Sequence, residues 1–176
     1  MDNPVWSFFF PQSAESKSTV ELLKSLTVFE NISTRNLVQI ERVLHERRYR
    51  AGEIVFNEGE PGAGMYIVKK GEVSIEKKVS SSDGGLRLAL IGERSFFGEL
   101  ALLDDISRSA SAVTTTETVL YGFSKPDLGN IMERDPRLGS RILVNLSRIV
   151  CSRLIKANDN LERVQNELNL IKSGAE

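Results

Sequence analysis

The stretch from Phe96 to Ala112 constrains the fold more than any other part of the sequence. It places Gly98 directly before a run of good helix formers at 99–103. Arg108 then follows ten residues after the glycine. A glycine lets the backbone turn tightly and leaves no Cβ in the way of a close contact. Because both the N–H groups of a helix start and a planar guanidinium favour anions, this stretch predicts a compact site for a phosphate group.

Glu99 adds a hydrogen-bond acceptor beside this expected phosphate site. An ionised carboxylate accepts hydrogen bonds and donates none, so its position suits a sugar hydroxyl. The alternative is an ordinary connection from helix to loop to strand, in which Arg108 is solvated.

The sequence between residues 47 and 124 has the two-residue period of β-strands. Short apolar runs such as 65–68 and 86–90 are separated by turn residues, including Gly52, Gly59 and Gly71. Many short strands with regular turn signals are typical of jelly rolls. We therefore expect a mainly β fold with flanking α-helices. Its centre is a double-stranded β-helix (jelly roll) of about eight strands.

Helical periodicity flanks the β region on both sides. Residues 19–44 form two amphipathic pieces, and Ser33 or Thr34 can cap the second of them. After the strands, residues 127–132 form a short helix, and Asp135-Pro136 opens a long one. We expect an N-terminal tail at 1–17, short N-terminal helices at 18–46, the β-roll at 47–124, and C-terminal helices at 125–176. The tail contains an aromatic cluster around Trp6 that either packs on its own domain or binds a partner.

The long C-terminal helix carries an apolar seam at heptad spacing. The seam comprises Leu143, Ser147, Val150, Leu154, Ala157, Leu161, Val164, Leu168 and Ile171. One narrow stripe on a lone helix would leave these side chains in water. We therefore expect a homodimer through this helix, and the leucine positions leave a higher oligomer as the alternative. Seven basic residues outnumber three acidic ones on the helix, which indicates a solvated face.

The pattern Phe-Gly-Glu-Leu-Ala-Leu at 97–102, followed by Arg-Ser-Ala-Ser-Ala at 108–112, resembles a known element. It is similar to the phosphate-binding cassette of cyclic-nucleotide-binding domains, a family that includes catabolite activator proteins and the regulatory subunits of cyclic-AMP-dependent protein kinase. The resemblance implies a ligand site made of Gly98, Glu99, Leu100, Ala101, Arg108 and Ser109. One departure is Arg94-Ser95, where the family usually has Gly-Asp or Gly-Glu, and it puts the turn before the cassette in question.

The same resemblance implies a role for each of these residues. Arg108 pairs with the cyclic phosphate, assisted by the amides of Leu100 and Ala101 and by the Ser109 hydroxyl. Glu99 holds the ribose 2′-hydroxyl, and Gly98 lets the ligand approach closely. A hydroxyl at the position of Ser109 leaves cyclic AMP and cyclic GMP open, with cyclic AMP preferred.

Composition and motifs argue against several other classes of protein. The 23 basic and 24 acidic residues give no overall attraction to nucleic acid or anionic membrane. Cys151 is the single cysteine, so no intrachain disulfide forms. No catalytic triad, P-loop or metal-ligand spacing is present, and Asp104 and Asp105 beside Glu99 indicate a solvated turn rather than an acid–base pair. We expect a cytoplasmic, non-enzymatic protein without cofactor, metal, membrane span or direct DNA binding.

These observations lead to a sensor domain that couples cyclic-nucleotide binding to movement of its C-terminal helix. One alternative is a structural protein-interaction module with a degenerate nucleotide pocket. Glu99 and Arg108 count against it, because a roll without a ligand has no need of that pair. Another is the sensor fragment of a transcription regulator that lacks its helix-turn-helix.

Overall fold

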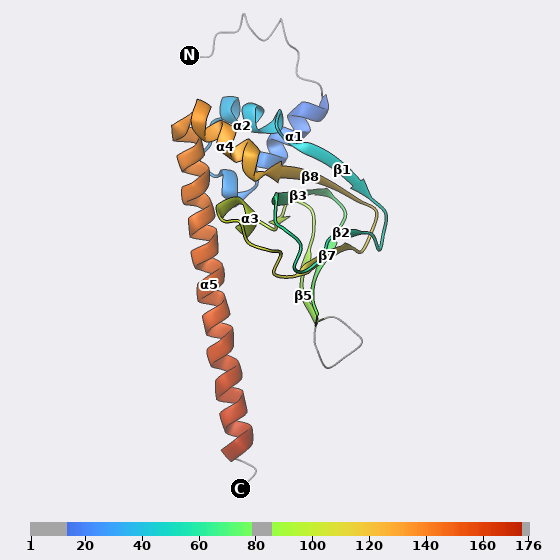
Figure 1. Ribbon diagram of the computed structural model, residues 1–176, viewed down its shortest axis with the longest axis vertical. Helices are drawn as coiled ribbons and strands as arrows, with labels where there is room; N and C mark the ends of the chain where they lie inside the picture. Colours follow the sequence, from blue (N-terminus) through green and yellow to red (C-terminus); the bar gives the residue numbers. More distant parts are fainter. Residues whose placement is uncertain (1–13, 79–85, 174–176) are drawn as a thin grey trace, which may run out of the picture.

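The computed structural model describes residues 14–78 and 86–173, so the aromatic cluster around Trp6 lies outside the described residues. Within them, eight strands form two four-stranded antiparallel sheets, which confirms the predicted jelly roll (Figure 1). One sheet has the strand order β1-β8-β3-β6, and the other has the order β2-β7-β4-β5. The strands are β1 (His45–Tyr49), β2 (Ile54–Phe56), β3 (Gly64–Lys70), β4 (Val73–Lys77), β5 (Leu86–Ile91), β6 (Phe96–Phe97), β7 (Ser111–Thr114) and β8 (Thr118–Ser124).

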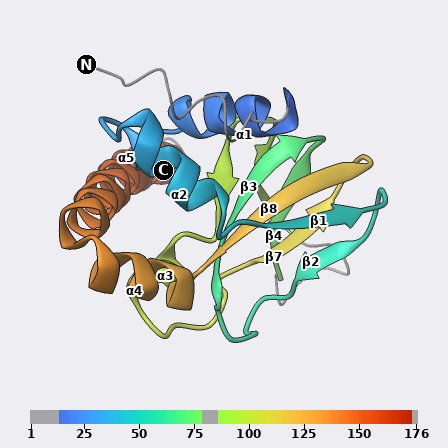
Figure 2. The same ribbon diagram turned by 90° about the horizontal axis from the view of Figure 1, so that it is seen from above.

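Short helices precede the roll and a long helix follows it, as expected. The helical elements are α1 (Ala14–Lys24), the 3-10 helix η2 (Thr27–Phe29), α2 (Thr34–Glu41), α3 (Leu100–Leu103), α4 (Lys125–Arg134) and α5 (Pro136–Ser173). Figure 2 shows that α1, α2, α4 and α5 gather at one side of the roll. Helix α1 begins at Ala14, four residues before the predicted boundary, because 14–17 are compatible with helix. Ser33 caps α2 by accepting a hydrogen bond from the backbone N–H of Asn36, as predicted.

The first turns of α5 are anchored in the larger hydrophobic core. Ile142 and Leu146 are fully buried there, so the start of the long helix packs on the roll. Between them, the Asn145 side-chain amide donates hydrogen bonds to the backbone oxygens of Val28 at 3.1 Å and Glu30 at 2.9 Å. A buried amide that is satisfied in this way fixes α5 against η2.

The turn between β5 and β6 forms although Arg94-Ser95 stands where the resemblance implies Gly-Asp or Gly-Glu. Arg94 adopts φ +58° there, in the left-handed region that disfavours most side chains. Two backbone hydrogen bonds close the turn: Arg94 N–H donates to the oxygen of Val68 at 3.0 Å, and Val68 N–H donates to that of Ser95 at 2.9 Å. These bonds and the adjacent sheet therefore hold Arg94 in a strained conformation.

Replacement of Gly71 by alanine should destabilise the roll strongly. Gly71 has φ +88°, and an added Cβ would lie 2.5 Å from Thr118 Oγ1 and 2.6 Å from the backbone oxygen of Glu117. Backbone strain and overpacking together should lower the free energy of unfolding by about 2–4 kcal/mol. Gly52 is the matched control, because it has φ +81° but open space around it. Gly52→Ala should cost only about 1 kcal/mol in urea unfolding, and equal losses in the two variants would contradict the packing argument.

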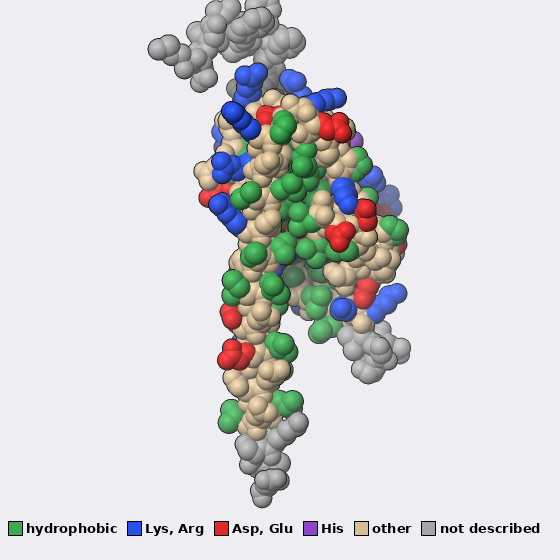
Figure 3. Space-filling model, turned by 60° about the vertical axis from the view of Figure 1, so that its left-hand side comes forward, with side chains coloured by type: hydrophobic (Ala, Val, Ile, Leu, Met, Phe, Trp, Pro, Cys, Tyr) green, Lys and Arg blue, Asp and Glu red, His purple; other side chains and the backbone are tan. Residues whose placement is uncertain are grey.

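Beyond its anchored start, α5 extends far past the roll (Figure 1). The seam residues Leu154, Leu161, Val164, Leu168 and Ile171 are 49–70% exposed in the single chain. Figure 3 shows hydrophobic side chains along this lower part of the helix. None of the helices in the described part of the chain is both long and apolar enough to cross a membrane.

Candidate functional site

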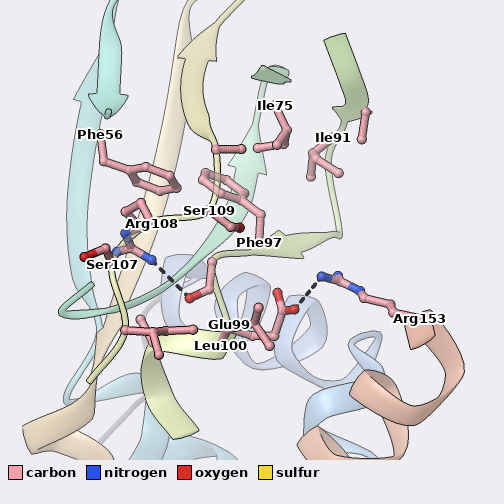
Figure 4. A pocket seen from close by; sticks show the side chains of 15 residues that line it. Phe56, Ile75, Ile91, Phe97, Glu99, Leu100, Ser107, Arg108, Ser109 and Arg153 are labelled. Carbon is pink, nitrogen blue, oxygen red and sulfur yellow. Dashed lines mark hydrogen bonds and ion pairs between the residues drawn. The ribbon is translucent and has the colours of Figure 1, made fainter. Parts of the chain in front are cut away.

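A cavity of about 400 Å³ lies between the roll, α3 and α5. All six residues that the sequence predicts for the site line it: Gly98, Glu99, Leu100, Ala101, Arg108 and Ser109. Figure 4 shows the side chains of Arg108 and Glu99 at the base of the cavity. Its other walls are apolar and include Phe56, Ile75, Ala89, Ile91 and Phe97. The cavity therefore combines one polar end with a hydrophobic remainder, which is typical of small-molecule sites.

Arg108 is held in this cavity by both its backbone and its side chain. The backbone N–H donates to the oxygen of Glu60, and the backbone oxygen accepts from Gly59 N–H, both at 2.8 Å. The guanidinium lies 4.1 Å above the centre of the Phe56 ring, a cation–π contact. Its Nη1 donates to the backbone oxygen of Gly98 at 3.1 Å. The position of the guanidinium is therefore fixed before any ligand arrives.

The hydrogen-bonding capacity of Arg108 is not exhausted by these contacts. Only 8% of the residue is exposed, and its Nε is buried without a hydrogen-bond partner among the described residues. Burial lowers the pKa of the guanidinium, although nearby Tyr66, Glu60 and Glu99 raise it. Within the described part of the chain, no carboxylate forms an ion pair with this buried cation. An anion in the cavity would satisfy both the charge and the free donor.

A side chain at position 98 would collide with Arg108, so glycine is needed here to make room for the guanidinium as well as for a ligand. It has φ +74°, and an added Cβ would lie 2.7 Å from Arg108 Nη1. Gly62 makes room for α3 in a similar way, because an added Cβ at Gly62 would lie 2.6 Å from Ala101 Cβ. These two close approaches bring α3 and Arg108 against the same end of the cavity.

Helix α3 offers backbone donors at the cavity. It begins at Leu100, directly after Glu99, whose side chain does not cap it. Ala101 N–H makes only a long bond, 3.3 Å, to the oxygen of Gly98. Ser109 lies exposed on the cavity wall. Asp104 and Asp105 do not line the cavity, and Asp105 instead pairs with Lys125 at 2.6 Å, so these residues do not form an acid–base pair with Glu99 in the site.

Arg153 also lines the cavity, although the sequence did not predict it there. Its Nη1 donates to Glu99 Oε1 at 2.5 Å, so α5 and the cassette are joined directly (Figure 4). The Glu99 side chain is 3% exposed, whereas that of Arg153 is 51% exposed. Arg153 is one of the seven basic residues of α5 that were expected on a solvated face. Its spacing from Ile142, Leu146 and Ile149 places it on the stripe that faces the roll, and this signal could have identified it.

The profile of the cyclic nucleotide-binding domain matches residues 46–135, which is slightly more than half of the chain. The chain therefore belongs to the cyclic nucleotide-binding domain family. Domains of this family are typically regulatory rather than catalytic, and the roll, the cassette and the cavity all lie within or beside the matched range.

Similar proteins agree with this assignment. The chain is 28% identical over 141 residues to a CRP-like cAMP-activated global transcriptional regulator of Mycobacterium tuberculosis, covering 80% of this chain and 61% of the regulator. The catabolite activator protein of Thermus thermophilus gives a TM-score of 0.71 at 27% identity, with 79% of this chain and 63% of that one covered. A cyclic nucleotide-binding domain of Methylobacillus flagellatus gives 0.72 at 22% identity, with 83% and 82% covered, and so supports the fold. The chain spans less than two thirds of the two regulators.

Proposed function

We propose that this chain is a sensor that binds cyclic AMP in the cavity and has no chemistry of its own. The observation that carries this proposal is Arg108, a buried and prepositioned guanidinium with an unpartnered Nε. Cyclic AMP is preferred to cyclic GMP because the mycobacterial relative is described as cAMP-activated. A thermal-shift screen tests the proposal, since a ligand that binds only the folded state raises the melting temperature. Cyclic AMP should raise it, cyclic GMP should raise it less, and 5′-AMP should leave it nearly unchanged.

The two ends of the cavity suggest how the ligand lies. The cyclic phosphate contacts Arg108, the backbone N–H groups of Leu100 and Ala101, and the Ser109 hydroxyl. Glu99 accepts a hydrogen bond from the ribose 2′-hydroxyl through Oε2, because its Oε1 already accepts from Arg153. The base then occupies the apolar part of the cavity.

The ion pair between Glu99 and Arg153 provides a path from the ligand to α5. A ribose bound to Glu99 holds its carboxylate in the position that Arg153 contacts, and so favours α5 against the cassette. A ligand shifts such an equilibrium only if it binds one arrangement more tightly than the other. The nucleotide therefore stabilises the closed position of the long helix, which transmits the signal.

Arg153→Ala should weaken cyclic AMP binding, because it leaves the buried Glu99 carboxylate without its partner. The loss should be about 1–2 kcal/mol, or roughly 5- to 30-fold in Kd by titration calorimetry. This range is below that of a fully buried pair because Arg153 is half exposed and solvent screens its charge. Arg148→Ala is the matched control, since Arg148 is an exposed arginine of the same helix outside the cavity. Similar losses in both variants would contradict the proposed path.

Glu99→Gln should weaken binding by less than loss of Arg108, and the effect should depend on the ribose. A neutral amide accepts a hydrogen bond more weakly than a carboxylate does. Calorimetry with cyclic AMP and its 2′-deoxy analogue on both proteins forms a double-mutant cycle. In the variant, the 2′-deoxy analogue should bind nearly as well as cyclic AMP. If the losses from the substitution and from the missing hydroxyl add, Glu99 does not contact the ribose.

We also propose that the chain forms a homodimer through the exposed seam of α5.

The second candidate function, a structural interaction module without a ligand, is favoured by the same exposed seam. It leaves the buried guanidinium and its free Nε without a role. The thermal-shift screen separates the two, because a pure interaction module would respond to none of the nucleotides.

A further inference from the structure

A second groove, with a volume of about 550 Å³, lies next to the nucleotide cavity. It runs between the end of α1, η2, the turn from β5 to β6, and α5. Its lining combines apolar residues, namely Leu26, Ile91, Phe96 and Ile149, with basic ones, namely Arg94, Arg148, Arg153 and Lys156. Among the described residues that line it, Glu30 supplies the one carboxylate. The groove thus has an apolar part and a strongly basic rim.

The walls of this groove are fixed in place. Asn145 ties α5 to η2 through the backbone oxygens of Val28 and Glu30. Arg94, which also lines the groove, is held at φ +58° by the backbone bonds of its turn. Strained residues that their surroundings hold in place cluster at functional sites. Here the strain holds an arginine on the rim of the groove, at a position where the family usually has glycine.

Three of the basic side chains have no charge partner within the described ranges. Arg94, Arg148 and Lys156 are exposed, and none of them forms an ion pair with a described residue. A cluster of like charges attracts a partner of opposite charge and selects against others.

We propose that this groove binds an acidic peptide segment of a partner protein, with an apolar side chain on the groove floor and carboxylates on the basic rim. The apolar floor distinguishes a peptide from a nucleic acid. Nucleic-acid backbones bind chiefly through phosphate contacts to basic surfaces and gain little from a buried aliphatic floor. Shape and charge therefore favour a peptide that alternates acidic and aliphatic residues.

The groove and the nucleotide cavity share Arg153 and Ile91. A carboxylate of the peptide would compete with Glu99 for Arg153. Bound nucleotide stabilises the ion pair of Glu99 and Arg153, so it should lower the affinity for the peptide. The peptide should lower the affinity for the nucleotide by the same factor. This linkage rests on the proposed function, whereas the peptide site itself does not.

Fluorescence anisotropy without nucleotide tests the peptide site. The probe is a labelled twelve-residue peptide of alternating Glu and Leu, and its counterpart with Lys in place of Glu is the charge control. The acidic peptide should bind with a Kd of about 10–100 µM, and R94E/R148E/K156E should weaken it at least about tenfold. R35E/R137E/R141E carries the same change in charge at exposed arginines outside the groove and should bind as the unaltered protein does. The milder R148Q/K156Q should give an intermediate loss with an unchanged melting temperature.

Equal losses in the two triple variants, or tighter binding of a DNA duplex than of the acidic peptide at equal ionic strength, would overturn the peptide site. Saturating cyclic AMP should raise the Kd of the peptide about fivefold, and R153Q should remove that difference. A peptide affinity that is identical with and without cyclic AMP would overturn the linkage. Calorimetry on the same sample shows whether cyclic AMP binds at all, so failure of the nucleotide site is distinguished from failure of the groove.

Discussion

Arg108→Ala is expected to weaken cyclic AMP binding by about 2–5 kcal/mol, which is roughly thirtyfold or more in Kd. The guanidinium is buried, lies over Phe56, and keeps its Nε free of hydrogen bonds among the described residues. Truncation would leave the cyclic phosphate in a largely apolar cavity without its counter-charge. Titration calorimetry on the purified chain measures the loss directly.

Arg108→Lys distinguishes charge from geometry at this position. A lysine keeps the charge but replaces a planar fork by a point charge, so binding should remain poor. Arg35→Ala, an exposed arginine on α2, is the control and should bind cyclic AMP normally. A melting temperature for each variant shows whether the loss of the contact with Phe56 has unfolded the roll. An unchanged affinity for cyclic AMP in a folded Arg108→Ala protein would contradict the assignment of the phosphate site.

The double substitution Leu154→Asp and Leu161→Asp should convert a dimer into a monomer. Both side chains are more than half exposed in the single chain and lie on the seam of α5. Two unpaired carboxylates in an apolar helix–helix contact would cost several kcal/mol, roughly 3–5 for each fully buried charge. The roll should stay folded, because α5 is anchored to it by Ile142 and Leu146, which lie before the seam positions that change. Analytical ultracentrifugation reports the change in mass.

Ile155→Asp with Asn166→Asp places the same two charges on a different face of α5 and should leave the dimer intact. Both positions are exposed. If the unaltered protein sediments as a monomer at tens of micromolar, with or without cyclic AMP, the dimer is wrong. The exposed seam would then have to contact a different protein.

The roll and the cassette could be predicted from the sequence because their signals are local. The period of two fixes which side chains face the interior of each strand. The stretch from Gly98 to Arg108 encodes its own geometry, since a left-handed glycine and a short helix bring the arginine back to the turn. All six residues expected at the site do line one cavity. Their roles toward a ligand stay predictions.

The role of Arg153 could not be predicted from local signals, because it depends on where α5 crosses the roll. Its partner Glu99 is 54 residues away in the chain. A heptad count shows the stripe that faces another helix and is less informative about the stripe that faces a sheet. The basic groove could not be predicted either, because η2, the β5–β6 turn and α5 meet only in the folded chain.

Arg94 shows that a turn can form where its usual local signal is missing. Absence of the usual glycine put the turn in question, yet the turn forms and the arginine accepts a left-handed backbone. Tertiary contacts, here the hydrogen bonds with Val68, outweigh the local preference. A single sequence shows the departure without showing what compensates for it.

Titration calorimetry of the unaltered chain with cyclic AMP, cyclic GMP and 5′-AMP tests the central claim most directly. We propose that the buried guanidinium, the donors of α3 and the Glu99 carboxylate bind a cyclic phosphate joined to a ribose. The account predicts saturable binding of cyclic AMP with about one site per chain and a Kd of about micromolar or lower. Cyclic GMP should bind more weakly, and 5′-AMP should bind weakly or not at all. If cyclic AMP produces no binding heat at several temperatures and no rise in melting temperature at about 1 mM, the cavity is not a cyclic-nucleotide site.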